Sequence, residues 1–462
     1  MRRLSRLLSR LPESPESQPP SPMWPHRNVP LGLLSNFLST TAGSIGIARD
    51  AYVLLLPEGV GTATNVGLME GMSGVVNLLT SFAAGVATDR CGRSPVLRLA
   101  AAACVLQASV TCLAVLYLPS RSGPQTVFVA LCAASTLFGA VKGSYFVALE
   151  AIFGDSTPQA RRTSFYVYKQ MSATAGLSVG PLIAVACFAL SHDTWTRPEL
   201  VSVIVAGAAI AVAQGVVCLF FRDDGCGGAR VGGLCASRRV APFLAASSLS
   251  LGFGSGIAYK FLPLYCMQSL ELTPIATHAI IALMQLTATA LNLLIRRLAR
   301  TTGPIGAAFL FMLVANAALA LVCLSADLPV PTPAIAIAIG VRGAFMNSIG
   351  GITGAVLNDH ISSEHRGKWA TLQSLSKTTW SGSAFIGGAL IDAVGYERTF
   401  LWPLAFHTLG MCLLLPILRS VPSEPRRRRQ EEVAPLNLPA TAGAGDLGCD
   451  GRAGCRASNL AV

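Results

Sequence analysis

The residues most able to do chemistry in this sequence are ionisable side chains inside long apolar stretches. Such charges are costly in a membrane, so each is a candidate for a functional role. They are Arg49, Asp50, Glu70, Lys142, Lys169, Lys260, Arg342 and Lys377. Cations outnumber acids among them, and a cation-rich cavity favours an anionic solute. We therefore expect an organic anion, such as a phosphate- or carboxylate-bearing metabolite; neutral sugars, peptides and drug-like cations are the alternatives.

The candidates for a solute cavity are mostly cationic. They are Arg342, Lys142, Asp50, Arg49, Lys260 and the polar residue Asn347. Arg342 falls near the middle of its apolar stretch, and neither Arg342 nor Lys142 has an obvious acid at the same depth. These two cations are therefore better candidates for solute contact than Arg49 and Asp50.

Asp50 and Glu70 are the candidates for proton coupling. An acid left unpaired in a low dielectric favours its protonated form, so Glu70 would take up a proton if it had no partner. Arg49 and Asp50 are adjacent, so on a helix they point about 100° apart and are not expected to face one partner. Asp50 is expected to pair with Lys260 or to face the cavity. For each of these charges, the alternative is an internal ion pair that fixes helix packing.

The elements that must position these residues are membrane helices. The chain has 462 residues, of which 52% are hydrophobic and 13% charged, whereas a soluble domain is about 25% charged. This composition excludes a disordered chain, a coiled coil and a small disulfide-linked fold, and it argues against a soluble enzyme. Twelve stretches reach the ~20 apolar residues that a membrane helix needs, at 31–56, 63–86, 95–118, 126–148, 163–190, 200–221, 241–264, 274–295, 304–325, 332–355, 370–394 and 399–419. The predicted fold class is an all-α membrane protein with twelve transmembrane helices.

The twelve spans divide into two sets of six. We predict a first six-helix half at 28–221 and a second at 241–420, joined by a cytoplasmic connector at 222–240. The segments 1–27 and 421–462 have the composition of disordered tails. The first segment lacks the apolar core of a secretory signal, although its Arg, Ser and Leu content leaves an organellar transit peptide open as an alternative.

Basic residues gather on one side of the predicted membrane. The net charge is +12, and most of the cations fall in the tails, the connector and the loops of one side. The positive-inside rule then predicts that both termini are cytoplasmic, in the plasma membrane or an organellar membrane. Arginines that face anionic lipids explain the charge without nucleic acid.

An internal repeat supports the division into halves. Asp155 stands seven residues before Arg162, Asp359 stands seven before Arg366, and the two copies are 204 residues apart. Together with the span count, this predicts two parallel pseudo-repeats, as expected of a transporter built from halves. Asp359 and Arg366 are then candidates for a gate loop in the second half.

The loop between the second and third spans carries the most specific motif. It reads GVATDRCGRSPVL, from Gly85 to Leu97, and it closely resembles the loop signature of the major facilitator superfamily. The matching residues are Gly85, Asp89, Arg90, Gly92, Arg93 and Leu97, and the departures are Ala87, Thr88 and Ser94. Because motif, location and span count agree, the chain resembles this superfamily over roughly residues 30–420.

The resemblance implies a mechanism and a set of roles. Two halves rock about a central site in alternating access, and the first, fourth, seventh and tenth spans line the cavity. Asp89 is then expected to bind the N-terminal end of the eleventh helix, whose dipole favours an anion, with Arg93 as a second member of this cytoplasmic gate. The alternative is that Arg90 and Arg93 only anchor lipid headgroups. The corresponding loop of the second half, Leu293–Gly303, keeps positive charge but not the motif.

Two further stretches carry partial resemblances. Gly176–Pro181 partly matches the antiporter signature of proton-coupled exporters, although Gly180 and Pro181 also suit close helix packing and a kink. The stretch Trp380–Asp392 resembles the corresponding span of poorly characterised plant and algal members of the superfamily.

The predicted function is secondary transport of a small solute, with protons as candidate coupling ions. No nucleotide-binding loop, Ser/His/Asp set or metal-ligand cluster is found in the sequence, so we expect neither an enzyme nor a cofactor nor a metal. The expected partners are membrane lipids, the solute and protons, without nucleic acid, and the chain is expected to act as a monomer. The alternatives are a transporter-like receptor or scaffold that binds solute without flux, and a drug/proton antiporter.

Overall fold

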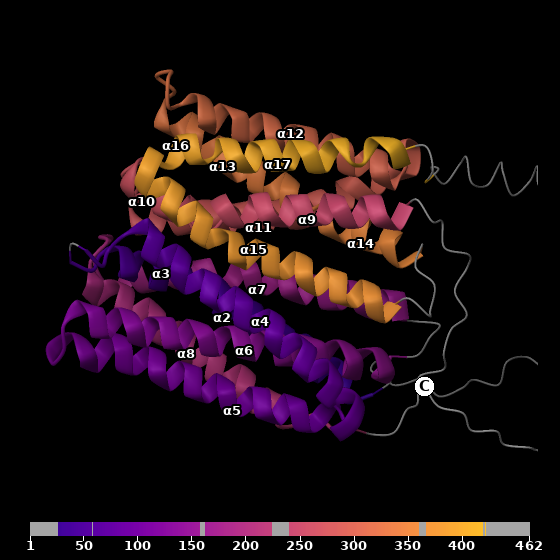
Figure 1. Ribbon diagram of the computed structural model, residues 1–462, viewed down its shortest axis with the longest axis horizontal. Helices are drawn as coiled ribbons and strands as arrows, with labels where there is room; N and C mark the ends of the chain where they lie inside the picture. Colours follow the sequence, from indigo (N-terminus) through magenta and orange to yellow (C-terminus); the bar gives the residue numbers. More distant parts are fainter. Residues whose placement is uncertain are drawn as a thin grey trace, which may run out of the picture.

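The computed structural model describes residues 26–57, 59–157, 162–223, 240–359, 366–418 and 421. Within these ranges the regular structure is entirely helical. The long helices run side by side along the length of the molecule, so the loops fall at its two ends (Figure 1). Most of the predicted connector lies outside the described residues. So do the predicted tails, apart from a few residues beside the first and last helices.

The chain forms helices in the order of the predicted spans. In the first half these are α2 (Asn28–Ser44), α3 (Ile47–Leu54), α4 (Ala63–Cys91), α5 (Arg93–Cys112), η1 (Leu113–Tyr117), η2 (Leu118–Ser120), α6 (Pro124–Ser156), α7 (Arg162–Leu190) and α8 (Arg197–Cys218). In the second half they are α9 (Val240–Ala258), α10 (Leu262–Gln268), α11 (Pro274–Thr302), α12 (Pro304–Leu324), α13 (Thr332–Asn347), α14 (Gly350–Asp359), α15 (Arg366–Val394), α16 (Tyr396–Thr399), α17 (Leu401–Cys412) and η5 (Leu415–Ile417).

Eleven helical segments of the described chain are long and apolar enough to cross a membrane. A further helix, α15, has 29 residues but carries Lys368 and Lys377, which makes it less apolar. The predicted fold class, an all-α membrane protein of twelve helices in two six-helix halves, is confirmed. Some helices run past the predicted spans: α6 reaches Ser156, because polar residues can continue a helix beyond the apolar core of the membrane.

Three of the crossings are interrupted near their middle. α2 and α3 are separated at Ile45–Gly46, α9 and α10 at Tyr259–Phe261, and α13 and α14 at Ser348–Ile349. Broken helices at membrane depth are tolerated where the backbone lines a cavity or is buried in protein. Two of these breaks position charged residues, because Arg49 follows the first break and Lys260 lies within the second.

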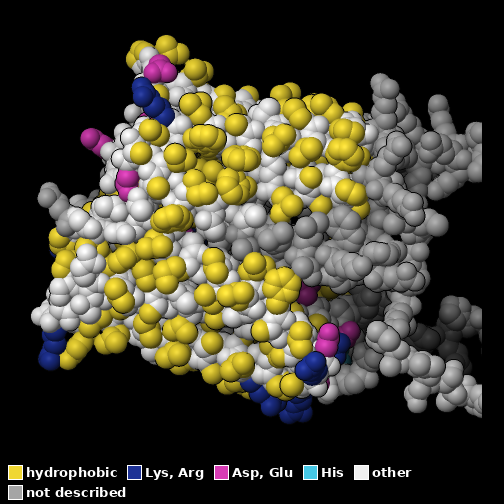
Figure 2. All heavy atoms as spheres, viewed as in Figure 1, with side chains coloured by type: hydrophobic (Ala, Val, Ile, Leu, Met, Phe, Trp, Pro, Cys, Tyr) yellow, Lys and Arg dark blue, Asp and Glu magenta, His cyan; other side chains and the backbone are white. Residues whose placement is uncertain are grey.

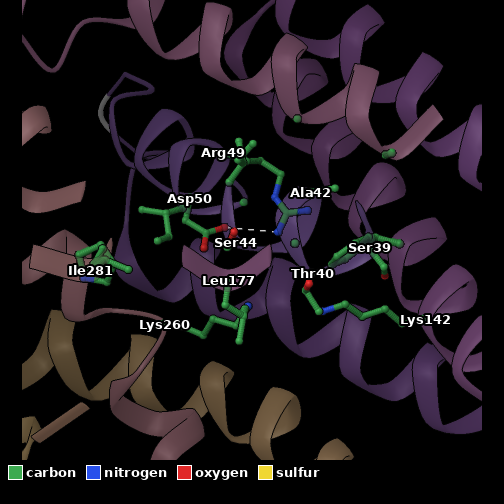
Figure 3. Close-up of a pocket in the computed structure, with 18 of the residues that line it drawn as sticks. Ser39, Thr40, Ala42, Ser44, Arg49, Asp50, Lys142, Leu177, Lys260 and Ile281 are labelled. Atoms are coloured by element: carbon green, nitrogen blue, oxygen red, sulfur yellow. Dashed lines mark hydrogen bonds and ion pairs between the residues drawn. The ribbon is translucent and has the colours of Figure 1, made fainter. Parts of the chain in front are cut away.

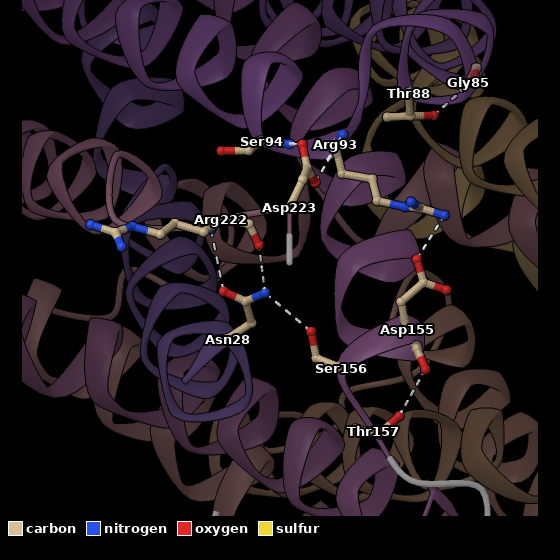
Figure 4. Close-up of polar contacts among 11 residues, drawn as sticks. Asn28, Gly85, Thr88, Arg93, Ser94, Asp155, Ser156, Thr157, Arg222 and Asp223 are labelled. Carbon is tan, nitrogen blue, oxygen red and sulfur yellow. Dashed lines mark hydrogen bonds and ion pairs between the residues drawn. The ribbon is translucent and has the colours of Figure 1, made fainter. Parts of the chain in front are cut away.

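The two ends of the bundle carry different groups. We call the end with Asn28, Asp89, Asp155 and Asp223 the tail end, because the described chain begins and ends there (Figure 1). We call the opposite end, where α4 and α11 begin, the capped end. At the tail end the amide of Asn28 donates to Ser156 Oγ (3.1 Å) and to the carbonyl oxygen of Arg222 (2.9 Å) (Figure 4). This side chain joins the start of α2 to the ends of α6 and α8.

The two halves of the chain meet closely where α4 packs on α15. A Cβ built on Gly67 would lie 2.5 Å from the carbonyl oxygen of Ala384, and one on Gly388 would lie 2.2 Å from that of Ala63. Small residues let helix backbones approach this closely in membranes. The first part of α4 and the last part of α15 are therefore in backbone contact toward the capped end.

The lateral surface of the bundle is apolar. On the face shown in Figure 2, hydrophobic side chains spread along the helices, whereas Lys, Arg, Asp and Glu side chains gather near the two ends. Leu99 and Ile337 are among the exposed members of this surface. Such a band suits lipid tails, so the chain is a multi-pass integral membrane protein.

Candidate functional site

A cavity of about 220 Å³ lies between the two halves, around the breaks in the first and seventh crossings (Figure 3). Its charged lining residues are Arg49, Asp50, Lys142 and Lys260. Its uncharged polar lining residues include Ser39, Thr40, Ser44, Gln107, Thr111 and Gln285. The structure thus brings four of the six predicted cavity residues together, from three different crossings.

A buried charge cluster of Arg49, Asp50, Glu70 and Lys260 lies beside this cavity. Lys260 Nζ is 2.7 Å from Glu70 Oε2, and the Arg49 guanidinium pairs with Glu70 Oε1. Arg49 Nη2 also lies 3.5 Å from Asp50 Oδ1 (Figure 3). Glu70 therefore binds one cation from each half of the chain.

These contacts decide between alternatives that the sequence left open. Glu70 is doubly ion-paired in this structure, which is the alternative of an internal ion pair. Lys260 pairs with Glu70, and Asp50 faces the cavity. Arg49 and Asp50 were expected to point apart, but the long Arg49 side chain reaches back to the neighbouring carboxylate. The sequence could not reveal these pairs, because they depend on how α4 is rotated against α3 and α9.

Aromatic rings accompany the cavity cations. Lys142 Nζ lies 4.4 Å from the centre of the Phe138 ring, and Lys260 Nζ lies 5.0 Å from the centre of the Trp380 ring. Both rings belong to residues that line the cavity. Cation–π contacts of this kind hold an ammonium group in place at modest cost in solvation. The cavity therefore offers cationic and apolar surfaces side by side.

The two remaining cavity candidates, Asn347 and Arg342, do not line the cavity. Asn347 Nδ2 donates to Gln285 Oε1 (3.3 Å), and Gln285 Nε2 donates to the Tyr259 hydroxyl (3.2 Å). Gln285 and Tyr259 line the cavity, whereas Asn347 does not. Arg342 is also absent from the lining and is buried within the second half. The prediction that Arg342 lies on the cavity wall is therefore wrong for this conformation, because its position along α13 fixes its depth but not its direction.

The motif loop at the tail end is anchored within the first half. Gly92 separates α4 from α5 with a φ of +92°, where a glycine is favoured. The carboxylate of Asp223 accepts from the backbone N–H of Arg93 (3.2 Å) and of Ser94 (2.9 Å), which caps the start of α5 (Figure 4). Arg93 Nη2 also pairs with Asp155 Oδ2 at 2.6 Å. Sequence analysis missed the role of Asp223.

Asp89 and Arg90 differ from Arg93. Both side chains are exposed, and neither makes an ion pair or side-chain hydrogen bond with the described residues. Gly85, on the same turn, accepts a bond from Thr88 Oγ1 through its carbonyl oxygen (2.8 Å) (Figure 4). The side chains at the start of α15 lie outside the described residues, so the expected contact of Asp89 with this helix stays a prediction.

The capped end carries two carboxylate caps between the halves, which sequence analysis also missed. Asp392 of α15 accepts from the backbone N–H of Ala63 (3.1 Å) and of Thr64 (2.7 Å), at the start of α4. Asp193, which follows α7, accepts from the backbone N–H of Ile275 (2.8 Å), at the start of α11. Neither α4 nor α11 has an acid in its first turn. Because the N–H groups at a helix start favour a carboxylate, this lack was the feature of the sequence that could have indicated a capping acid from another element.

Two other predicted sites have different outcomes. A Cβ on Gly180 would lie 1.9 Å from Ser44 Oγ, so the segment with Pro181, which lies inside α7, packs closely on α2.

Asp359 ends α14 and Arg366 begins α15. Their side chains, and residues 360–365 between them, lie outside the described residues. The gate-loop prediction for this pair stays a prediction.

Comparison with known proteins agrees with this geometry. The model of the Major Facilitator Superfamily matches residues 33–387. Similar solved structures include a D-xylose-proton symporter, with 11% identity, a TM-score of 0.68 and coverage of 86% of this chain and 97% of that one. Another is a bacterial homologue of the iron transporter ferroportin in an inward-facing state, with 14% identity, a TM-score of 0.62 and coverage of 85% of this chain and 98% of that one. A third is the nucleoside transporter NupG, with 14% identity, a TM-score of 0.58 and coverage of 85% of this chain and 99% of that one. Identities this low show a shared fold alone. No curated protein sequence matches the chain.

Proposed function

Because the chain belongs to the Major Facilitator Superfamily, a family of membrane transporters and not a class of enzymes, we propose that it moves a small organic anion by alternating access. The observation that carries this proposal is the charge of the cavity lining. Three cations, Arg49, Lys142 and Lys260, face the cavity with a single lining acid, Asp50.

The charges beside the cavity leave a positive excess for a solute. Glu70 neutralises part of the charge of Arg49 and Lys260, and Asp50 lies near Arg49. With Lys142 included, three cations stand against two carboxylates. A carboxylate or phosphate group would complete the balance through charge-assisted hydrogen bonds. The rings of Phe138 and Trp380 offer apolar surface to the rest of an organic molecule.

The same contacts suggest how solute binding could move the halves. Glu70 lies on α4 of the first half, whereas Lys260 follows α9 of the second. An anion that binds Lys260 competes with Glu70 for this cation and so weakens a link between the halves. A ligand shifts a conformational equilibrium only through such a difference in contacts between two states. We place the coupling between solute and rocking motion at this ion pair.

For proton coupling, Asp50 is a better candidate than Glu70. Both oxygens of Glu70 are engaged by cations. Asp50 lines the cavity, and its ion pair with Arg49 is longer, at 3.5 Å. A proton on Asp50 would cost less interaction energy than a proton on Glu70. The proposal is an anion carrier in which Asp50 exchanges a proton with the cavity.

The test is uptake by purified protein in liposomes, with labelled carboxylates, phosphate esters, neutral sugars and amines. Lys142→Gln should lower anion uptake at least tenfold, which is about 1.4 kcal/mol, while Lys142→Arg keeps most of it. Arg98→Gln, an exposed cation on α5, is the matched control and should keep wild-type uptake. Flux of neutral or cationic solutes alone would refute the anion proposal, and binding without flux would favour a receptor.

Asp50→Asn tests the proton step in the same liposomes. It should abolish the stimulation of uptake by an imposed pH gradient while keeping exchange of labelled for unlabelled solute. Gradient-driven uptake that survives in Asp50→Asn would exclude this residue from proton coupling.

A further inference from the structure

Arg342 is a buried cation at the centre of α13. Its side chain is only 3% exposed, and its Nε and Nη2 atoms have no hydrogen-bond partner among the described residues. The neighbouring Gly343 packs on α11, where a Cβ would lie 1.8 Å from Met284 Sδ, so α13 is held firmly at this level. An uncompensated guanidinium in a low dielectric is strongly unfavourable. The charge therefore needs an anion.

The described part of the second half supplies no acid at this depth. Its described acids are Glu271, Asp327, Asp359, Asp392 and Glu397, and all of them lie between helices or near helix ends. Asp359 is seventeen residues beyond Arg342, which corresponds to about 25 Å along a helix. Of the buried acids of the first half, Asp50 and Glu70 already contact other cations, and Glu199 lies in the first turn of α8, where it accepts from Thr194 Oγ1.

Neighbouring helices place further polar groups near Arg342. His407 of α17 is 1% exposed and lies within electrostatic range of Arg342. Its Nε2 contacts Ser255 Oγ at 3.1 Å, whereas its Nδ1 has no partner among the described residues. Tyr259 is likewise within electrostatic range of the guanidinium. Arg342 thus lies among α9, α13 and α17.

Asn316 of α12 adds an amide at the same level. The rings of Phe311 and Phe345 have centres 4.9 Å apart and planes tilted by 50°. Because α12 and α13 run antiparallel, the height of Asn316 along the bundle is then within one helical turn of that of Arg342. Asn316 is 6% exposed, and both its amide atoms lack partners among the described residues. Buried amides are normally hydrogen-bonded, so this group also points to a ligand.

We propose that the second half binds a small anion at Arg342. Nε–H and Nη2–H form the fork that fits two carboxylate oxygens or one halide. His407 lies within electrostatic range of Arg342, and Asn316 lies at a similar height on α12. The anion comes either from solution, as an inorganic ion, or from the carboxylate of a solute. The proposal goes beyond the proposed function, because Arg342 does not line the cavity that carries the anion in that proposal.

The test measures thermal stability of the purified full chain without transported solute. Chloride or acetate replaces a bulky sulfonate stepwise at constant ionic strength. The melting temperature of the wild type should rise to a plateau with either anion, Arg342→Met should show no rise, and Arg342→Lys should need at least tenfold more anion. Arg98→Gln should respond as the wild type does.

The outcomes separate the two sources. A rise with chloride as well as acetate supports a resident inorganic anion, and a rise with acetate alone supports a solute carboxylate. A flat wild-type response, or an unchanged response in Arg342→Met, overturns the site. If Arg342→Met does not fold, binding of labelled chloride and acetate to Arg342→Lys decides, because wild-type affinity there would refute the proposal. Lys142→Gln should lose uptake but keep the rise in melting temperature with anion. The transport proposal and the Arg342 site can therefore be refuted independently of each other.

Discussion

At its first residues α4 is bound to the second half through Asp392, whereas in its last turn Asp89 makes no side-chain contact with the described residues of that half. Asp392 accepts from Ala63 N–H and Thr64 N–H, and Thr64 Oγ1 donates to it as well (2.6 Å). Asp89 remains exposed. One helix thus carries a formed link at the capped end, whereas the link of Asp89 to α15 at the tail end stays a prediction.

The comparison shows that one physical device serves both ends. A helix start has unsatisfied N–H groups and a positive dipole end, so a carboxylate from another element stabilises it. Asp392 on α4 and Asp193 on α11 use this device at corresponding helices of the two halves. Asp89 is predicted to use it on α15. If the halves rock, the capped-end bonds and the Asp89 bond belong to opposite states of the cycle.

The largest effect is expected from Gly388→Ala. Its Cβ would lie 2.2 Å from the carbonyl oxygen of Ala63, so α4 and α15 would have to separate, and overpacking of this kind costs about 1–3 kcal/mol. Uptake should fall at least tenfold, and hydrogen exchange at Ala63 and Thr64 should become faster. Gly382→Ala on the same helix has open space around its Cβ and should match the wild type. Equal effects of both variants would contradict the packing argument.

A smaller effect is expected from Asp392→Asn. The loss of a charged cap costs about 0.5–2 kcal/mol, so exchange at Ala63 and Thr64 should speed up by about two- to thirtyfold. Asp193→Asn should do the same at Ile275 and leave Ala63 unchanged. If the caps act independently, the double variant should show the sum of the two costs within about 0.5 kcal/mol. If hydrogen exchange at Ala63 is unchanged in Asp392→Asn, then Asp392 does not stabilise the start of α4.

The sequence predicted the fold and much of the cavity for identifiable reasons. Apolar stretches of sufficient length define membrane helices without reference to packing. The cost of a buried charge then marks Arg49, Asp50, Lys142 and Lys260, and all four line the cavity. Depth along a span can be read from the sequence, because each helical residue advances the chain by a fixed rise.

The direction in which a side chain points could not be read in the same way. Membrane helices are apolar toward lipid as well as toward protein, so the hydrophobic pattern does not fix their rotation. This is why Arg342 was expected on the cavity wall and the partner of Glu70 was left open. The capping acids were missed for a different reason: Asp392 and Ala63 are 329 residues apart, and nothing local links them.

The smallest effect on stability is expected from Asp89→Asn, the variant that probes the predicted link to α15. Because Asp89 has no side-chain partner among the described residues, its replacement should change the free energy of unfolding by less than about 0.5 kcal/mol. Uptake should nevertheless fall, because the opposite state of the cycle would lose its bond to α15. Arg93→Gln breaks the half-exposed pair with Asp155 and should lower stability slightly more, within about 1 kcal/mol. Wild-type uptake by Asp89→Asn would mean that the predicted link at the tail end has no part in the cycle, and the contrast between the two ends of α4 would then be structural alone.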